Sequence, residues 1–181
     1  MNIAVSKSNE RIKKLVFAAV CLALAMVLPF FTGQIPKIGK ALAPMHIPVL
    51  LCGFVSGPMW GLIVGLVAPM LRCHLFATPA LASAFTMTFE LAAYGFFTGL
   101  LYKILPKRTL NIYISLISAM ILGRIVAGIV KYIVAVANGN EFIFSAFIAG
   151  TVTGAVPGMI CQIVLIPIIV IALKKFAVSS T

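Results

Sequence analysis

The sequence predicts an all-α membrane protein that crosses the bilayer several times. The chain has 181 residues, of which 62% are hydrophobic and only 9% are charged. A soluble domain carries about 25% charged residues, so this chain lacks the polar side chains that a water-exposed surface needs. The basic residues stand in short runs beside long apolar stretches, as in membrane proteins with basic cytoplasmic loops. Lipid is therefore the expected solvent for most of the surface.

The breaks between apolar stretches predict six helices, because about 20 apolar residues cross the hydrocarbon core. The apolar segment 41–71 is too long for one helix, and Gly57-Pro58 divides it, since Pro is tolerated in a first helical turn. The two resulting helices are short and would tilt or not fully span. The expected single domain, 1–181, holds helices at about 12–31, 43–56, 58–71, 81–105, 110–137 and 142–173. The last contains Pro157 and Pro167, which predict a kink.

The basic runs also predict how the helices are oriented. Six crossings place both termini on one side, and the runs at 7–14, 103–108 and 174–175 predict that this side is the cytoplasm. We therefore expect a multi-pass protein of the cell membrane with both termini cytoplasmic. The first apolar stretch, 15–35, is too long for a typical signal peptide and is expected to be a retained helix. Lys37, Lys40 and Arg72 fall on the predicted outer side and are exceptions.

Several functions are disfavoured because the sequence lacks the motifs that they need. The net charge of +11 does not predict nucleic-acid binding, because no basic face is interleaved with exposed aromatic residues. A phosphate-binding loop of the G-x-x-x-x-G-K-[ST] type is absent, so ATP hydrolysis is not expected of this chain. We expect no cofactor and no metal, because no His has carboxylate or thiol companions at ligand spacing. The cysteines are scattered and predict no disulfide framework: Cys21, Cys52, Cys73 and Cys161.

Small residues recur every four positions on several predicted helices. Such stripes let helix backbones approach closely in lipid, so intramolecular packing is the expected role of the glycines. Ala19 and Ala23 make another stripe on the first helix, and their spacing alone does not decide between internal packing and a partner helix. The glycine stripes are Gly53-Gly57-Gly61-Gly65, Gly95-Gly99 and Gly150-Gly154-Gly158.

Four polar residues are predicted at membrane depth on two helices. Arg124 and Lys131 are seven residues apart and share a face of the fifth helix, whereas Glu90 and Tyr94 are four apart on the fourth. An ionised side chain near the bilayer centre is costly unless it is paired or faces water. Two interpretations follow: a buried Glu90–Arg124 ion pair that holds two helices together, or a polar cavity that opens outward.

The second interpretation predicts a site for a small anionic ligand and no catalytic residues. Positively charged groups outnumber the one carboxylate at this depth, which suits an anion held by charge-assisted hydrogen bonds. His74 and Asn140 could add to the polar lining. The predicted substrate-binding residues are Arg124, Glu90, Tyr94, Lys131, Arg72, His46, Asn138 and Gln162.

Three stretches of the chain, taken in order, resemble a known family. They are 44–54 (PMHIPVLLCGF), which leads into the first glycine stripe, 89–95 (FELAAYG) and 123–126 (GRIV). Together they resemble the S components, or substrate-binding subunits, of energy-coupling factor (ECF) transporters, and within these the group associated with pantothenate. The resemblance covers nearly the whole chain.

The resemblance implies a six-helix bundle with a vitamin site near the outer surface, covered by external loops. It implies docking onto a shared ECF module of one membrane T component and two ATPases. An Ala-xxx-Ala stripe on the first helix contacts the T component in that family, and Ala19 and Ala23 match it. The implied mechanism is capture outside, tilting of the S component, and release inward driven by ATP hydrolysis on the partner. Pantothenate, a carboxylate with hydroxyls and an amide, agrees with the cationic excess.

Other functions remain open at this stage. The substrate could be another water-soluble vitamin or a precursor. The chain could instead be an autonomous proton-coupled carrier with Glu90 as its proton site. An intramembrane enzyme is disfavoured, because no nucleophile–base pair or metal triad can be assembled from these residues.

Overall fold

The computed structural model describes residues 2–33, 43–106, 108–139 and 156–179. Within these ranges the chain is helical and contains no strand, which confirms the predicted fold class. The described helices are α1 (Asn2–Gly33), α3 (His46–Ser56), α4 (Pro58–Phe76), α5 (Leu81–Ile104), α6 (Thr109–Ala137) and α8 (Val156–Ser179).

Five of the described helices are long and apolar enough to cross a membrane, and α3 is not. Its 11 residues rise about 17 Å, roughly half of the hydrocarbon core. The helix α4 continues to Phe76, five residues beyond its predicted end, because Arg72 is buried against α1 instead of opening a polar loop. Pro167 lies inside α8 as expected. The predicted start of that helix, at 142, lies outside the described residues.

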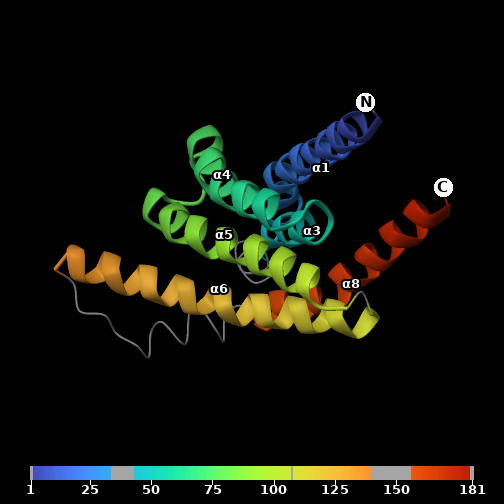
Figure 1. The fold of residues 1–181 in the computed structure, drawn as a ribbon. Coiled ribbons are helices and arrows are strands. Elements are labelled where there is room, and N and C mark those ends of the chain that lie inside the picture. The colour runs from blue at the N-terminus through green and yellow to red at the C-terminus, as the bar shows by residue number, and fades with distance from the viewer. Residues whose placement is uncertain (1, 34–42, 107, 140–155, 180–181) are drawn as a thin grey trace.

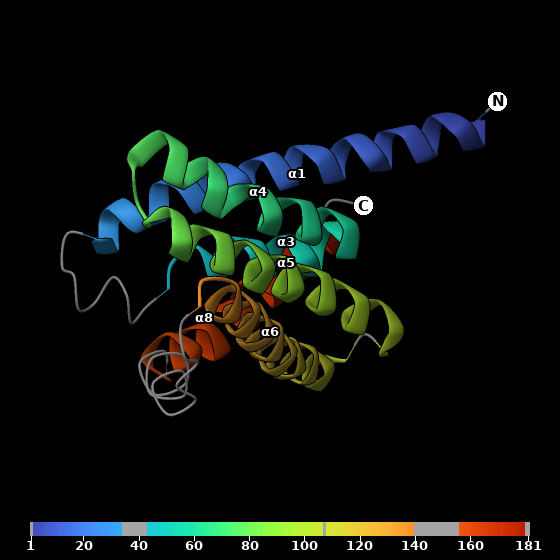
Figure 2. The ribbon, with the colours of Figure 1, turned by 90° about the vertical axis from the view of Figure 1, so that its left-hand side faces the viewer.

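The helix α5 lies at the centre of the bundle, between α4 and α6 (Figures 1 and 2). Both ends of the chain and the connection between α5 and α6 lie at the same end of the bundle (Figure 1). The basic runs are therefore gathered at this end of the bundle, as six crossings predict. We call this end of the bundle the basic end. Its described cations are Arg11, Lys13, Lys14, Lys103, Arg108, Lys174 and Lys175. The N-terminal part of α1 projects beyond the neighbouring helices (Figure 2).

Five stripe glycines pack α3 and α4 against α5, as predicted: Gly53, Gly61, Gly65, Gly95 and Gly99. Gly57 is an exception, because it ends α3 at a φ of +95° and an added Cβ atom would meet nothing within 4 Å. A Cβ atom built on Gly61 would lie 2.5 Å from the carbonyl oxygen of Gly95. One built on Gly99 would lie 2.5 Å from the backbone nitrogen of Pro58. Backbone this close leaves no room for a methyl group. Gly150 and Gly154 lie outside the described residues.

The helix α1 buries one face in the bundle and leaves another exposed. Ala18, Cys21 and Ala25 belong to the apolar cluster shared with α3, α4 and α5. Ala19 and Ala23, by contrast, are exposed. The Ala-xxx-Ala stripe is therefore not used for packing within the described bundle.

Candidate functional site

Glu90 is the centre of a buried polar cluster formed by three helices. Nη1 of Arg124, on α6, lies 3.1 Å from Oε1 of Glu90, on α5. The Tyr94 hydroxyl donates to the same oxygen at 3.2 Å. Nε2 of His46, at the start of α3, lies 3.8 Å from it, which is beyond hydrogen-bonding distance. We call these four residues the Glu90 cluster.

The local sequence explains why these side chains converge. Glu90 and Tyr94 are one turn apart on the face of α5 that packs against α6, so the hydroxyl can reach the carboxylate. The ring of Tyr94 fits against α6 because residue 123 is glycine, whose absent side chain leaves space for it. The imidazole of His46 packs at 5.2 Å from the Tyr94 ring, measured between centroids. The Glu90–Arg124 ion pair, one of the two interpretations of the sequence, is thus present.

The cluster holds more hydrogen-bonding capacity than the chain satisfies. Nε of Arg124 and both ring nitrogens of His46 are buried without a hydrogen-bond partner in the described structure. Buried polar groups in native proteins nearly always have a partner. Nε of Arg124 is an N–H donor, and an imidazole always carries at least one such donor. The cluster is therefore chemically suited to an acceptor such as a carboxylate, hydroxyl or carbonyl oxygen.

Two other predicted site residues lie on α6, which carries Arg124, and on α8, which packs against α3 and α6. Lys131 is half-buried, two turns beyond Arg124 on α6. Gln162, on α8, is 2% exposed, and its neighbours Met159 and Ile163 pack against the core cluster that contains Tyr94.

Arg72 makes its described contacts away from the Glu90 cluster. Arg72 donates a hydrogen bond to the carbonyl oxygen of Met26, and its guanidinium lies 4.9 Å and 5.4 Å from the ring centroids of Phe30 and Phe76. It therefore joins α4 to α1.

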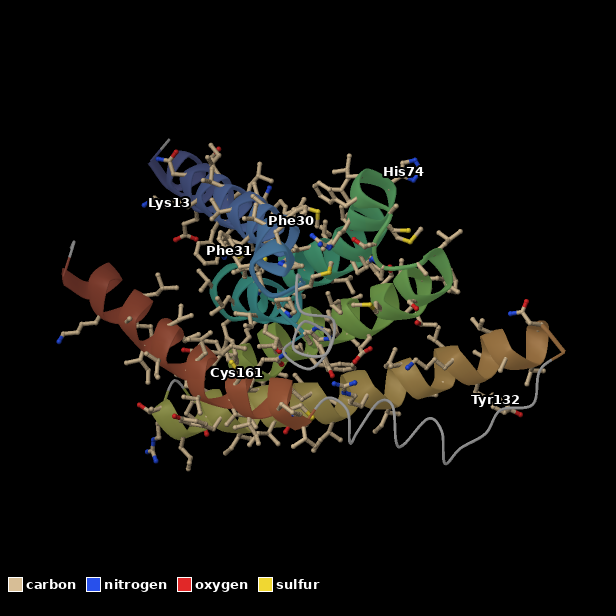
Figure 3. The ribbon with its side chains drawn as sticks, turned by 180° about the vertical axis from the view of Figure 1, so that it is seen from behind. Lys13, Phe30, Phe31, His74, Tyr132 and Cys161 are labelled. Carbon is tan, nitrogen blue, oxygen red and sulfur yellow. The ribbon has the colours of Figure 1, made fainter. Side chains whose placement is uncertain are left out.

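Asn138 caps the exposed end of α6 and donates to the carbonyl oxygen of Val134 at 2.8 Å. His74 is exposed at the far end of α4 (Figure 3). Asn140, Lys37 and Lys40 lie outside the described residues.

Gly123 is a residue of the site that sequence reasoning missed. It was noticed only as part of the GRIV stretch. Its signal was a glycine in the middle of a helix, where it costs about 1 kcal/mol relative to alanine and calls for a packing reason. The described residues also contain no group of three or more His, Cys, Asp or Glu side chains that could hold a metal ion.

Comparison with known proteins assigns this bundle to a family. A family model described as "ECF transporter, substrate-specific component" matches residues 13–180. Searches of curated proteins and of solved structures gave no match. Such components are substrate-binding subunits of transporters and not enzymes, which fits a membrane bundle with a buried polar cluster. The chain therefore belongs to the family of substrate-specific components of ECF transporters.

Proposed function

We propose that this subunit captures pantothenate, a small water-soluble vitamin that carries a carboxylate, at the Glu90 cluster. The observation that supports the proposal most strongly is the set of buried, unpartnered nitrogen atoms on Arg124 and His46. A carboxylate would accept charge-assisted hydrogen bonds from Arg124, which are about twice as strong as neutral ones.

Each residue of the cluster has a distinct part in this proposal. Glu90 uses Oε1 to hold Arg124 and Tyr94, and so fixes the guanidinium in one orientation. Arg124 then presents its remaining N–H groups to the ligand. His46 supplies a hydrogen-bonding group from a third helix, and Lys131 and Gln162 extend the polar lining toward the amide and hydroxyls of the ligand. The vitamin is thus recognised by charge at one end and by neutral hydrogen bonds along its length.

Transport would require a partner, and α1 provides a suitable surface. Ala19 and Ala23 are exposed on α1 while the adjacent Ala18 is buried in the bundle. Small exposed side chains let a second membrane helix approach closely. We propose that this stripe docks onto the T component of an ECF module, whose two ATPases drive tilting of the bundle and inward release.

The experiment that tests the substrate is calorimetric titration of the detergent-solubilised protein with pantothenate and with panthenol. Panthenol differs only in having an alcohol in place of the carboxylate. Loss of a charged hydrogen bond worth about 2 kcal/mol predicts roughly 30-fold weaker binding of panthenol. Equal affinities would contradict the proposed role of the carboxylate. Binding of neither compound would exclude pantothenate, and mass spectrometry of co-purified small molecules would then identify the vitamin.

A further inference from the structure

A second polar cluster lies on the same face of α5 as the Glu90 cluster. Polar residues recur there every four positions, at Glu90, Tyr94, Thr98 and Tyr102, and all four are buried. Ser115, on α6, is also buried. Because residues four apart stack along one side of a helix, these side chains form a polar stripe that continues from the Glu90 cluster toward the basic end.

The pairing of α5 with α6 places Thr98 and Ser115 at the same depth. The two helices run antiparallel (Figure 1), and Glu90 faces Arg124 across them. Thr98 lies eight residues along α5 from Glu90, and Ser115 lies nine residues back along α6 from Arg124. At 1.5 Å per residue, both lie about 12–14 Å deeper than the ion pair.

The hydroxyls of this inner cluster are unpartnered. Thr98 and Ser115 are 0% exposed and Tyr102 is 8% exposed, yet none of their oxygen atoms has a hydrogen-bond partner in the described structure. Other buried hydroxyls on α5 do have one: Thr88, for example, donates to the carbonyl oxygen of Ala84 at 2.8 Å. Three unpartnered hydroxyls on adjoining helices are costly in a membrane protein, where lipid offers no hydrogen bonds.

We propose that Thr98, Tyr102 and Ser115 line an inner compartment that binds water within the bundle. A buried water typically makes about three hydrogen bonds to otherwise unsatisfied polar groups, and this cluster offers three hydroxyls. The compartment lies beyond Tyr94, whose ring packs against Gly123 and separates it from the ligand site. At its other limit, the Tyr102 ring lies 4.8 Å from Nζ of Lys174, at the basic end.

This water would extend hydrogen bonding along the inner half of the polar stripe. It would link Thr98 and Ser115 to Tyr102, whereas the Tyr94 hydroxyl bonds Glu90 on the ligand side. The inference goes beyond the proposed function and does not depend on which ligand the Glu90 cluster binds. It predicts that water is bound among Thr98, Tyr102 and Ser115, although these side chains are as buried as those of the apolar core.

Thiol proton exchange tests the proposal directly. We would place single cysteines by Thr98→Cys and by Ser115→Cys in a background whose native cysteines are alanine. The matched control retains only Cys52, which is 0% exposed in the apolar cluster of α1, α3 and α4. Each protein is transferred to D₂O, whose molecules are the size of those that the compartment would bind, and loss of the thiol S–H stretch is followed by infrared spectroscopy. The thiol proton exchanges for a deuteron from the solvent.

Water in the compartment predicts that cysteines at 98 and 115 exchange their protons at least about tenfold faster than Cys52, because a buried thiol exchanges only where water reaches it. Rates equal to that of Cys52 at both positions would overturn the proposal. The two positions are independent tests. Ser115→Cys is nearly isosteric, and Thr98→Cys loses one methyl group. Thermal unfolding of each variant checks the fold, and calorimetric titration with pantothenate reports separately on the ligand site. If pantothenate binding is unchanged and the cysteines at 98 and 115 are no faster than Cys52, only the inner compartment is rejected.

Discussion

Gly123 packs directly against the ring of Tyr94. A Cβ atom at residue 123 would lie 3.2 Å from Cγ of Tyr94 and nearer still to two other ring carbons. The next residue along α6, Arg124, holds the carboxylate to which the Tyr94 hydroxyl donates. Two adjacent residues of α6 therefore contact the cluster: Gly123 packs against the Tyr94 ring, and Arg124 pairs with Glu90. A change in the packing of Tyr94 should consequently alter the ion pair as well.

Gly123→Ala should weaken pantothenate binding by displacing Tyr94 from Glu90. Loss of one hydrogen bond to a charged group, worth about 1.5 kcal/mol, predicts roughly tenfold lower affinity by calorimetric titration. Tyr94→Phe, which keeps the ring and removes the hydroxyl, is the matched variant. If both act through the same hydrogen bond, the double variant should bind about as well as either single one. Additive losses would show that Gly123 acts by another route.

Arg72→Gln should lower stability and leave pantothenate affinity nearly unchanged. The substitution removes the contacts of the guanidinium with Phe30 and Phe76, each worth about 0.5–2 kcal/mol. The melting temperature in detergent should therefore fall, whereas that of the control His74→Ala, at an exposed position, should not. A large loss of pantothenate affinity in folded Arg72→Gln protein would indicate that Arg72 binds the ligand, as first predicted.

Cysteine introduced at Asn138 should react with an impermeant thiol reagent applied to intact cells. The positive-inside rule predicts that the basic end faces the cytoplasm, so this exposed end of α6 should face outward. A cysteine at Arg108, in the same background without native cysteines, should react only after lysis. The reverse pattern in folded protein would invert the proposed orientation.

Ala19→Trp and Ala23→Trp should each abolish uptake by the assembled transporter and leave vitamin binding by the isolated subunit nearly intact. A bulky side chain on this exposed stripe would prevent close approach of a partner helix without disturbing the bundle. Ile125→Trp, on the exposed face of α6, is the control and should support uptake. Parallel losses of uptake and of binding in the Ala19 or Ala23 variant would indicate internal packing instead.

Hydropathy and spacing predicted the helices and much of their packing. Apolar runs located the described helices, and the repeat of glycine every four residues anticipated the close contact of Gly61 with Gly95. The helix at 58–71 was expected to be short, whereas α4 is long enough to cross a membrane. The end of α4 was misplaced because Arg72 looked like a loop residue. Its burial depends on Phe30 and Met26 of α1, and a contact between distant segments leaves no local pattern.

The Glu90 cluster was only partly predictable, for a similar reason. Glu90 with Tyr94, and Arg124 with Lys131, were recognised because residues one or two turns apart share a helix face. That His46 would join them depended on how α3 packs against α5. Thr98, Tyr102 and Ser115 were missed because single hydroxyl residues are common in membrane helices, and only their burial without partners distinguishes them.

The most direct test of the proposed site is the affinity of Arg124→Ala/Glu90→Gln for pantothenate, compared with that of the unsubstituted protein. Arg124→Ala alone leaves a buried carboxylate unpaired, at a cost of about 3–5 kcal/mol in stability, so a loss of binding could reflect misfolding. Glu90→Gln removes that charge and allows the bundle to fold. If Arg124 binds the vitamin carboxylate, calorimetry should show roughly 30-fold weaker binding by the double variant, equivalent to about 2 kcal/mol. Full affinity in the folded double variant would contradict the account and leave Arg124 with a structural role only.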